Sequence, residues 1–219
     1  MIDIEKWMKS YVAAVQNAFG SRVRFIGLQG SYGRGEATDT SDIDVVCILD
    51  RLAMGDLAAY DAAVSTLPHR ELLCGFVSGW EELMHWQCAD LFSFYYDTKP
   101  IYGDIHQLLE RLDEGAIRRS IHISACNLYH MCVHNILHEK SPEILQGLYK
   151  EAAFVIRAIC FTRTGKYYRI KSDLLCAASL QEGEILSIGD SLKKGASVDF
   201  LQCSQRMLEW SSALILQYA

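Results

Sequence analysis

Apolar residues recur at helical spacing near the start of the chain, between residues 3 and 19, and Gly20 can end the helix that this pattern predicts. Short apolar runs follow that are typical of buried strands, at 23–29, 43–49, 71–77 and 91–96. The segments between them predict a loop at 30–41, a helix at 52–67, a short helix or turn at 81–86 and a turn at 99–104. The first half of the chain therefore mixes strands with helices.

The second half has the longer periodic pattern of helices. One or two long helices are predicted at 105–139, and Ser141 with Pro142 forms a helix start, with serine as N-cap and proline at the first helical position. That helix runs to about Thr164, Gly165 can close it, and further helical stretches lie at 174–181 and 198–217. We therefore predict an α+β protein with a small mixed sheet and its helices at 1–103 and a helical bundle at 104–219.

Composition and charge narrow the classes of protein that fit. Half of the residues are apolar and only three are proline, which is typical of a folded chain. The chain shows neither a signal peptide nor an apolar run near the roughly 18–20 residues of a membrane span, so we expect a cytoplasmic protein without a membrane partner. Eight cysteines without C-x-x-C spacing favour reduced core residues.

Negative charge is concentrated in the first half of the chain. Residues 1–103 carry 8 Lys or Arg and 14 Asp or Glu, whereas residues 104–219 carry 13 of each. The acidic half argues against a broad nucleic-acid surface, which needs positive charge, but it suits bound divalent cations.

The segment with the clearest chemistry is Q-G-S-Y-G-R-G-E-A-T-D-T-S-D-I-D-V-V, residues 29–46, which follows one predicted strand and enters another. Gly30 has no side chain to keep a phosphate from the backbone, and Ser31 offers a hydroxyl and an N–H as donors. Asp42 and Asp44 are two residues apart at a strand, so both carboxylates point to one face. Carboxylates in this arrangement can bind two divalent ions, and hard oxygen ligands favour Mg²⁺.

These residues resemble the G-S…D-x-D signature of the nucleotidyltransferase superfamily, whose members are similar to DNA polymerase β, and they look closest to small bacterial proteins such as aminoglycoside adenylyltransferases. The resemblance implies an N-terminal nucleotidyltransferase domain, a C-terminal helical bundle, ATP as the donor and a small-molecule acceptor. Transfer of AMP onto a partner protein, and a nucleotide-binding module with weak catalysis, are the alternatives. The nucleotide preference and the oligomeric state are left open.

The same resemblance implies a third carboxylate, from a neighbouring strand, that completes the metal site or acts as base. Glu71, at the start of the predicted third strand, is the first candidate, and Cys74 can occupy the position where a relative carries glutamate. Asp90 is the second candidate, and Glu151 of the helical half is the third. The sequence leaves the choice among them open.

Two further sets of positive charge are candidates for binding the phosphates. Arg34, between two glycines, can reach a phosphate or pair with Glu36 or Asp39. The second set is a basic run in the helical half, comprising Arg163, Lys166, Arg169 and Lys171. A triphosphate held by an acidic domain needs positive charge from the facing side, so we expect Lys171 above all to contact it.

Overall fold

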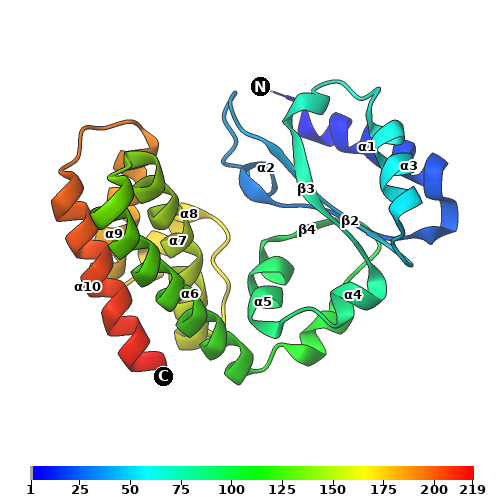
Figure 1. Ribbon diagram of the computed structural model, residues 1–219. Coiled ribbons are helices and arrows are strands. Elements are labelled where there is room, and N and C mark those ends of the chain that lie inside the picture. Colours follow the sequence, from blue (N-terminus) through cyan, green and yellow to red (C-terminus); the bar gives the residue numbers. More distant parts are fainter. Residues whose placement is uncertain (1) are drawn as a thin grey trace. The chain divides into compact units, whose positions relative to one another are not determined.

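The computed structural model describes residues 2–219, which divide into two compact units (Figure 1). The first unit comprises the residues up to 87 together with 94–110, and the second comprises 88–93 and 111–219. The α+β class is confirmed, with strands in the first unit and helices throughout the second. The turn at 103 and 104, where we expected the boundary, lies inside the first unit.

A four-stranded mixed sheet forms the centre of the first unit. Its strands are β1 (Val23–Leu28), β2 (Ile43–Leu49), β3 (Leu73–Gly79) and β4 (Lys99–Tyr102), in the order β3-β2-β1-β4. β1 runs antiparallel to both β2 and β4, whereas β2 and β3 are parallel. The predicted strand at 43–49 is confirmed at both ends.

Two helices, α1 (Ile4–Phe19) and α3 (Met54–Val64), pack against each other in the first unit (Figure 1). Asp3 caps α1 by accepting a hydrogen bond of 3.1 Å from the Lys6 N–H. The apolar side of α1 shares one core with alternate residues of β2, namely Ile43, Val45, Cys47 and Leu49. Because these residues face the core, the intervening residues of β2, including Asp44, face the opposite side of the sheet.

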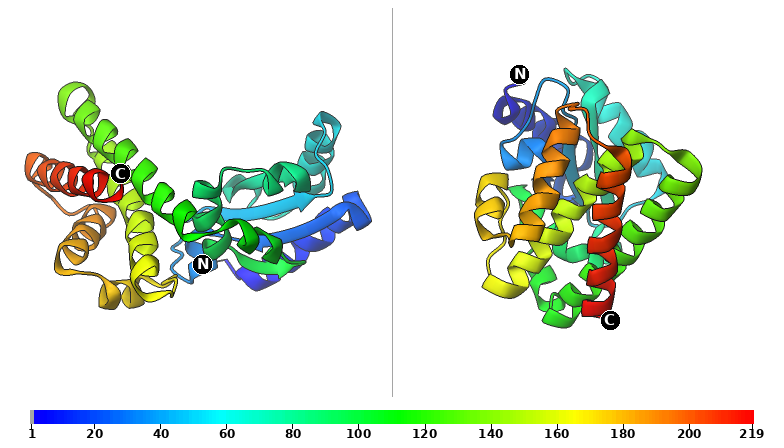
Figure 2. Two further views of the ribbon diagram at one scale, coloured as in Figure 1. Left: turned by 90° about the horizontal axis from the view of Figure 1, so that it is seen from below. Right: turned by 90° about the vertical axis from the view of Figure 1, so that its left-hand side faces the viewer.

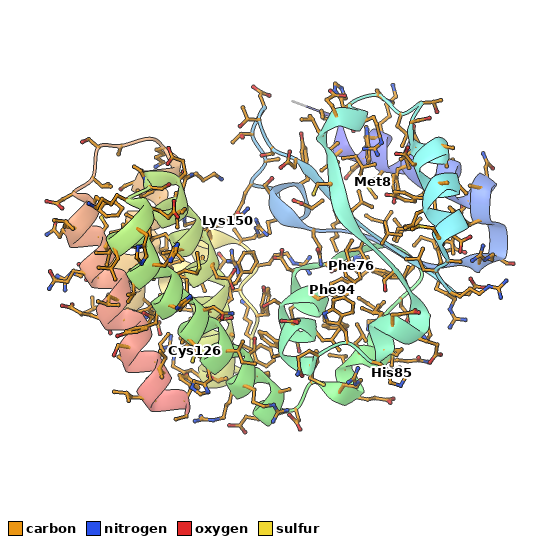
Figure 3. All side chains as sticks on the ribbon, viewed as in Figure 1. Met8, Phe76, His85, Phe94, Cys126 and Lys150 are labelled. Atoms are coloured by element: carbon orange, nitrogen blue, oxygen red, sulfur yellow. The ribbon has the colours of Figure 1, made fainter. Side chains whose placement is uncertain are left out.

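Aromatic packing marks that opposite side. Two helices, α4 (Trp80–Met84) and α5 (Cys88–Asp97), follow β3 in the chain. The ring of Phe76 in β3 lies 5.2 Å from the ring of Phe94 in α5 (Figure 3). Phe76 also packs edge-on against Trp86, at 5.4 Å between ring centroids. The side of the sheet that carries Asp44 is therefore partly covered by aromatic rings.

Two predicted elements of the first half are wrong. Residues 91–96, expected as a strand, lie in α5, and the turn expected at 99–104 contains β4. The run L-F-S-F-Y-Y has strand-forming residues, but Leu91 and Phe92 are buried while the next four residues are partly exposed, which fits one face of a helix. β4 is exposed along its whole length and contains Pro100, which an edge strand tolerates, so it carries no apolar pattern.

The second unit is a bundle of helices: α6 (Glu114–His134), α7 (Pro142–Thr164), α8 (Lys171–Ala177), α9 (Leu180–Lys193) and α10 (Phe200–Tyr218). α10 packs against α6, α7 and α9 (Figure 2). Ser141 caps α7 and Gly165 ends it in the left-handed conformation, as predicted. A 3₁₀ segment, His106–Arg111, precedes α6, and a π-helical turn, Asn135–Glu139, follows it.

The predicted helix at 174–181 is interrupted. Ser179 caps α9 and shares reciprocal hydrogen bonds with Glu182, so α8 and α9 are separate helices. None of the eight cysteines forms a disulfide, but only four of them are buried, and Cys74, Cys126 and Cys176 are exposed. Among the helices of residues 2–219, none has the length and apolar character needed to cross a bilayer.

Candidate active site

A tight turn joins β1 to a short helix, α2 (Gly30–Arg34), at one end of the sheet. The Gln29 N–H donates a hydrogen bond of 2.8 Å to the Asp44 carbonyl, which ties the turn to β2. Gly30 has a φ of +64°, in the left-handed region that favours glycine. The loop expected at 30–41 therefore begins with one helical turn, the arrangement that would expose the Ser31 N–H and hydroxyl as donors.

Gly30 lies directly against the side chain of Asp44. A methyl group added at residue 30 would lie 1.8 Å from Asp44 Oδ2 and 2.7 Å from the carboxyl carbon. No side chain other than hydrogen fits there while Asp44 keeps its place. The structure thus brings together two residues 14 positions apart that the sequence motif predicts to share a site.

The two aspartates stand at the start of β2. Asp42 is exposed and directly precedes the strand, whereas Asp44 is partly exposed between the buried residues Ile43 and Val45. Continuing the alternation of β2 by one residue places Asp42 on the same side of the sheet as Asp44. Two carboxylates on one side of a strand end, with that of Asp44 against Gly30, provide oxygen ligands of the kind that Mg²⁺ prefers.

Comparisons with known proteins agree with this geometry. Residues 8–112, just under half of the chain, match the family of nucleotidyltransferase domains. Over these residues the chain is similar to nucleotidyltransferase domains. This segment contains most of α1, the whole sheet and the Gly30–Asp44 site, and it confirms the family resemblance of the sequence motif.

Two named relatives extend the comparison. A stretch of 46 residues, 21% of the chain, is 41% identical to a protein of Methanocaldococcus jannaschii provisionally named a protein adenylyltransferase, and the match spans 46% of that relative's length. The fold of the chain is similar to the spectinomycin adenyltransferase AAD(9) of Enterococcus faecialis, whose crystal structure contains ATP and spectinomycin. That similarity has a TM-score of 0.58 at 14% identity and covers 97% of this chain and 99% of the other.

The family resemblance implies a third carboxylate beside Asp42 and Asp44, and its three candidates lie at different places in the fold. In the register of the parallel strands, Asp44 pairs with Cys74, which is exposed. Glu71 lies in a 3₁₀ turn, Arg70–Leu72, before β3, where its carboxylate is 3.8 Å from His69 Nδ1. Among residues 2–219, no three His, Cys, Asp or Glu side chains are grouped closely enough to hold a metal ion.

The other two candidates for the third carboxylate belong to the second unit. Asp90 lies in the first turn of α5, which the sequence pattern had assigned to a strand, and Glu151 lies in α7. Desolvation by the surrounding residues raises the pKa of Glu151, and the negative charge of Asp90 raises it further, against the opposing effect of Lys150.

Arg34, at the end of α2, has two acidic partners. Its Nη1 lies 2.7 Å from Asp97 Oδ2, and its Nε lies 3.2 Å from Glu36 Oε2. The pairing of Arg34 with Glu36 that the sequence suggested is present. Asp97, which sequence reasoning missed, is only 5% exposed, and no local motif distinguishes it from other helix-end aspartates.

The basic run of the second unit is engaged within that unit. Arg163 forms two hydrogen bonds with the buried Glu182, of 2.7 and 2.8 Å, and Lys171 pairs with Asp190. The buried Arg157 donates to the carbonyls of Tyr168 and Arg169 and so holds the segment between α7 and α8. The predicted contacts of Arg34 and Lys171 with a nucleotide remain predictions.

Proposed function

We propose that the chain is a metal-dependent nucleotidyltransferase that moves AMP from ATP onto a hydroxyl group of a small-molecule acceptor. The observation that carries this proposal is the contact of Gly30 with the carboxylate of Asp44. It places the backbone of Gly30 and Ser31 directly beside an oxygen ligand for a cation at one strand end. The nucleotidyltransferase domain at residues 8–112 supports the same reaction class.

In this reaction the acceptor oxygen forms a bond to the α-phosphorus of ATP while the bond to the bridging oxygen of the β-phosphate breaks. Pyrophosphate leaves with that bonding electron pair, and the hydroxyl proton passes to a base or to water. The backbone of Gly30 and Ser31 would bind the phosphates, Ser31 would donate hydrogen bonds to them, and Asp42 and Asp44 would hold divalent cations. Mg²⁺ held there would neutralise charge on the triphosphate and the leaving group.

Two acceptor classes have support. The similarity to AAD(9), which covers nearly the whole of both chains, favours a small molecule such as an aminoglycoside-like antibiotic. The short match to the protein of Methanocaldococcus jannaschii favours a protein acceptor as the second candidate. The chain spans less than half of that relative, so the small molecule remains our first choice.

The deciding experiment incubates the protein with ATP labelled on the α-phosphate, Mg²⁺ and separate panels of hydroxyl-bearing antibiotics and purified proteins. We expect labelled acceptor and released pyrophosphate, both lost in Asp44→Ala. Asp61→Ala is the matched control, since Asp61 is an exposed carboxylate of the same unit that pairs with Arg70 at 2.8 Å. Label on a protein alone would replace the small-molecule acceptor with the second candidate.

A third outcome has a specific structural basis in the pairing of Cys74 with Asp44. A site with no carboxylate at that register position has fewer groups to accept the hydroxyl proton. ATP binding that depends on Asp44, without pyrophosphate release for any acceptor, would overturn the transferase proposal and identify a nucleotide-binding module.

A further inference from the structure

We propose that Asp97 is a positioning residue for the transfer reaction: it fixes α2, and through α2 it sets the placement of Gly30 and Ser31. This inference rests on the function proposed above. Asp97 would not touch the reacting atoms, because its carboxylate is buried against Arg34.

The first observation is the ion pair at the end of α2. Arg34 is the last residue of the helix, and its side chain and that of Asp97 are 11% and 8% exposed. A charged pair with so little solvent around it has a fixed geometry, since water cannot take the place of either partner. The end of α2 is therefore anchored to the end of α5, at the residues Phe94–Asp97 that belong to the first unit.

The second observation concerns the beginning of α2. Gln29, its N-cap residue, donates from its side-chain Nε2 to Thr98 Oγ1 at 2.6 Å and to the Phe94 carbonyl at 3.3 Å. Thr98 directly follows Asp97. The residues on both sides of the Gly30–Ser31 pair are thus bonded to the same end of α5, and we call these contacts the α5 clip.

Close packing leaves α2 little room inside the clip. A methyl group on Gly33 would lie 2.7 Å from the Leu28 carbonyl oxygen and 3.9 Å from the Asp97 carbonyl oxygen. The second carboxylate oxygen of Asp97, Oδ1, is buried without a hydrogen-bond partner. A buried acceptor in this state is costly, and it persists where the surrounding structure holds the group in place for another reason.

The consequence is a division of labour around the nucleotide. Gly30 and Ser31 face the phosphates, whereas Asp97 and Gln29 determine where that backbone stands. Small displacements of a binding turn weaken binding and catalysis even when every contacting residue is intact. Loss of the clip should therefore weaken ATP binding while Asp42 and Asp44 remain unchanged.

The test compares Asp97→Asn with Asp56→Asn in the full chain. Asp56 is the matched control, because it pairs with Arg22 at 2.7 Å in the same unit and its side chain is 14% exposed, and neither residue belongs to α2 or β2. Two measurements are made on each variant: backbone hydrogen exchange of residues 30–36 without nucleotide, and the dissociation constant of ATP with Mg²⁺.

We expect Asp97→Asn to speed exchange at Gly33 and Glu36 and to raise the Kd and KM for ATP about tenfold, with a much smaller change in kcat. Asp97→Glu should recover part of the affinity, and Asp56→Asn should leave both measurements at the wild-type values. Unchanged exchange and affinity in Asp97→Asn would overturn the inference, as would equal losses in the two asparagine variants.

A double-mutant cycle separates the clip from a direct role of Arg34. If Arg34 and Asp97 act as one unit, the pair Arg34→Ala with Asp97→Ala should lose no more affinity than Arg34→Ala alone. Additive losses would mean that Arg34 binds phosphate itself, which contradicts the inference. Wild-type protein that binds no ATP would instead overturn the proposed function, and with it any positioning role in that reaction.

Discussion

The two units differ in how their candidate functional groups are held. In the first unit the site follows from the backbone: a left-handed glycine, a strand alternation and a hydrogen bond between Gln29 and Asp44 place the candidate groups. In the second unit the candidate groups are basic side chains, and ion pairs hold them in place: Arg163 with Glu182 and Lys171 with Asp190. Residue spacing predicts a site that the backbone places, but it does not predict which side chains on different helices will pair.

These two ion pairs of the second unit differ in exposure, which separates a structural pair from one whose lysine is available for binding. The bidentate pair of Arg163 with Glu182, which is 5% exposed, has the geometry of a structural bond between α7 and α9. The pair of Lys171 with Asp190 is about one-third exposed on both side chains, so its lysine can exchange partners at lower cost. The variants below test the two kinds of arrangement against each other.

The largest effect is expected from Gly30→Ala. Alanine at residue 30 would have to adopt the left-handed backbone conformation, and its methyl group would displace the Asp44 carboxylate. We therefore expect transfer activity to fall by about 10²-fold or more. Gly35→Ala is the matched control, since Gly35 has a φ of +74° but nothing within 4 Å of the added methyl group. Steady-state rates at saturating ATP measure the difference.

Both glycine variants should lose about 1–2 kcal/mol of stability because both force alanine into the left-handed region, and Gly30→Ala should lose more because its methyl group also displaces Asp44. Only Gly30→Ala should also lose activity. Equal activities in the two variants would show that the closeness of Gly30 to Asp44 has no part in the reaction.

The next effect concerns Cys74, which pairs with Asp44 in the register of β2 and β3. Cys74→Glu places a carboxylate there, and if proton transfer limits the reaction, turnover should rise about tenfold, less than the roughly 10²–10⁴-fold that a well-positioned general base contributes. Cys74→Ser controls for loss of the thiol and should leave turnover near the wild-type rate. A lower rate in Cys74→Glu would indicate that the base comes from elsewhere, with Glu71, Asp90 and Glu151 as the residues to vary next.

A smaller effect is expected in the second unit. Lys171→Ala should raise the KM for ATP about fivefold, a loss in the range of one charge-assisted contact at a partly exposed site. Arg163→Ala should leave that KM unchanged but lower the free energy of unfolding by about 1–2 kcal/mol, because it deprives the buried Glu182 of its partner. Parallel measurements of KM and of chemical denaturation separate the two residues.

If both variants change only stability, the basic run is structural throughout. If Arg163→Ala also raises the KM, its pairing with Glu182 positions the segment that carries Lys171. Either result would show whether the ion pairs of the second unit serve nucleotide binding or only stability.

The same contrast explains which parts of the molecule could be predicted from the sequence. β2 was predicted to the residue because it is a nearly unbroken apolar run, I-D-V-V-C-I-L, in which every residue but Asp44 is buried, and α7 because serine, proline and glycine mark its ends. β4 was missed because it is held by pairing with β1, where Gly27 lies opposite Pro100, and not by any apolar pattern of its own. Asp97 was missed for a related reason, since only the tertiary fold brings it to Arg34.

The smallest effect tests an ion pair of the first unit that lies outside the motif. The Arg22 guanidinium, together with the Ala53 N–H, lowers the pKa of Asp56 to about 2. Because the folded-state pKa lies below the unfolded value of about 3.9, the pair stabilises the fold fully above that value and loses its effect as the pH falls toward 2. Asp56→Asn should therefore flatten the decline in stability across this window, as measured by denaturation midpoints at successive pH values. An unchanged decline would mean that other carboxylates dominate acid unfolding.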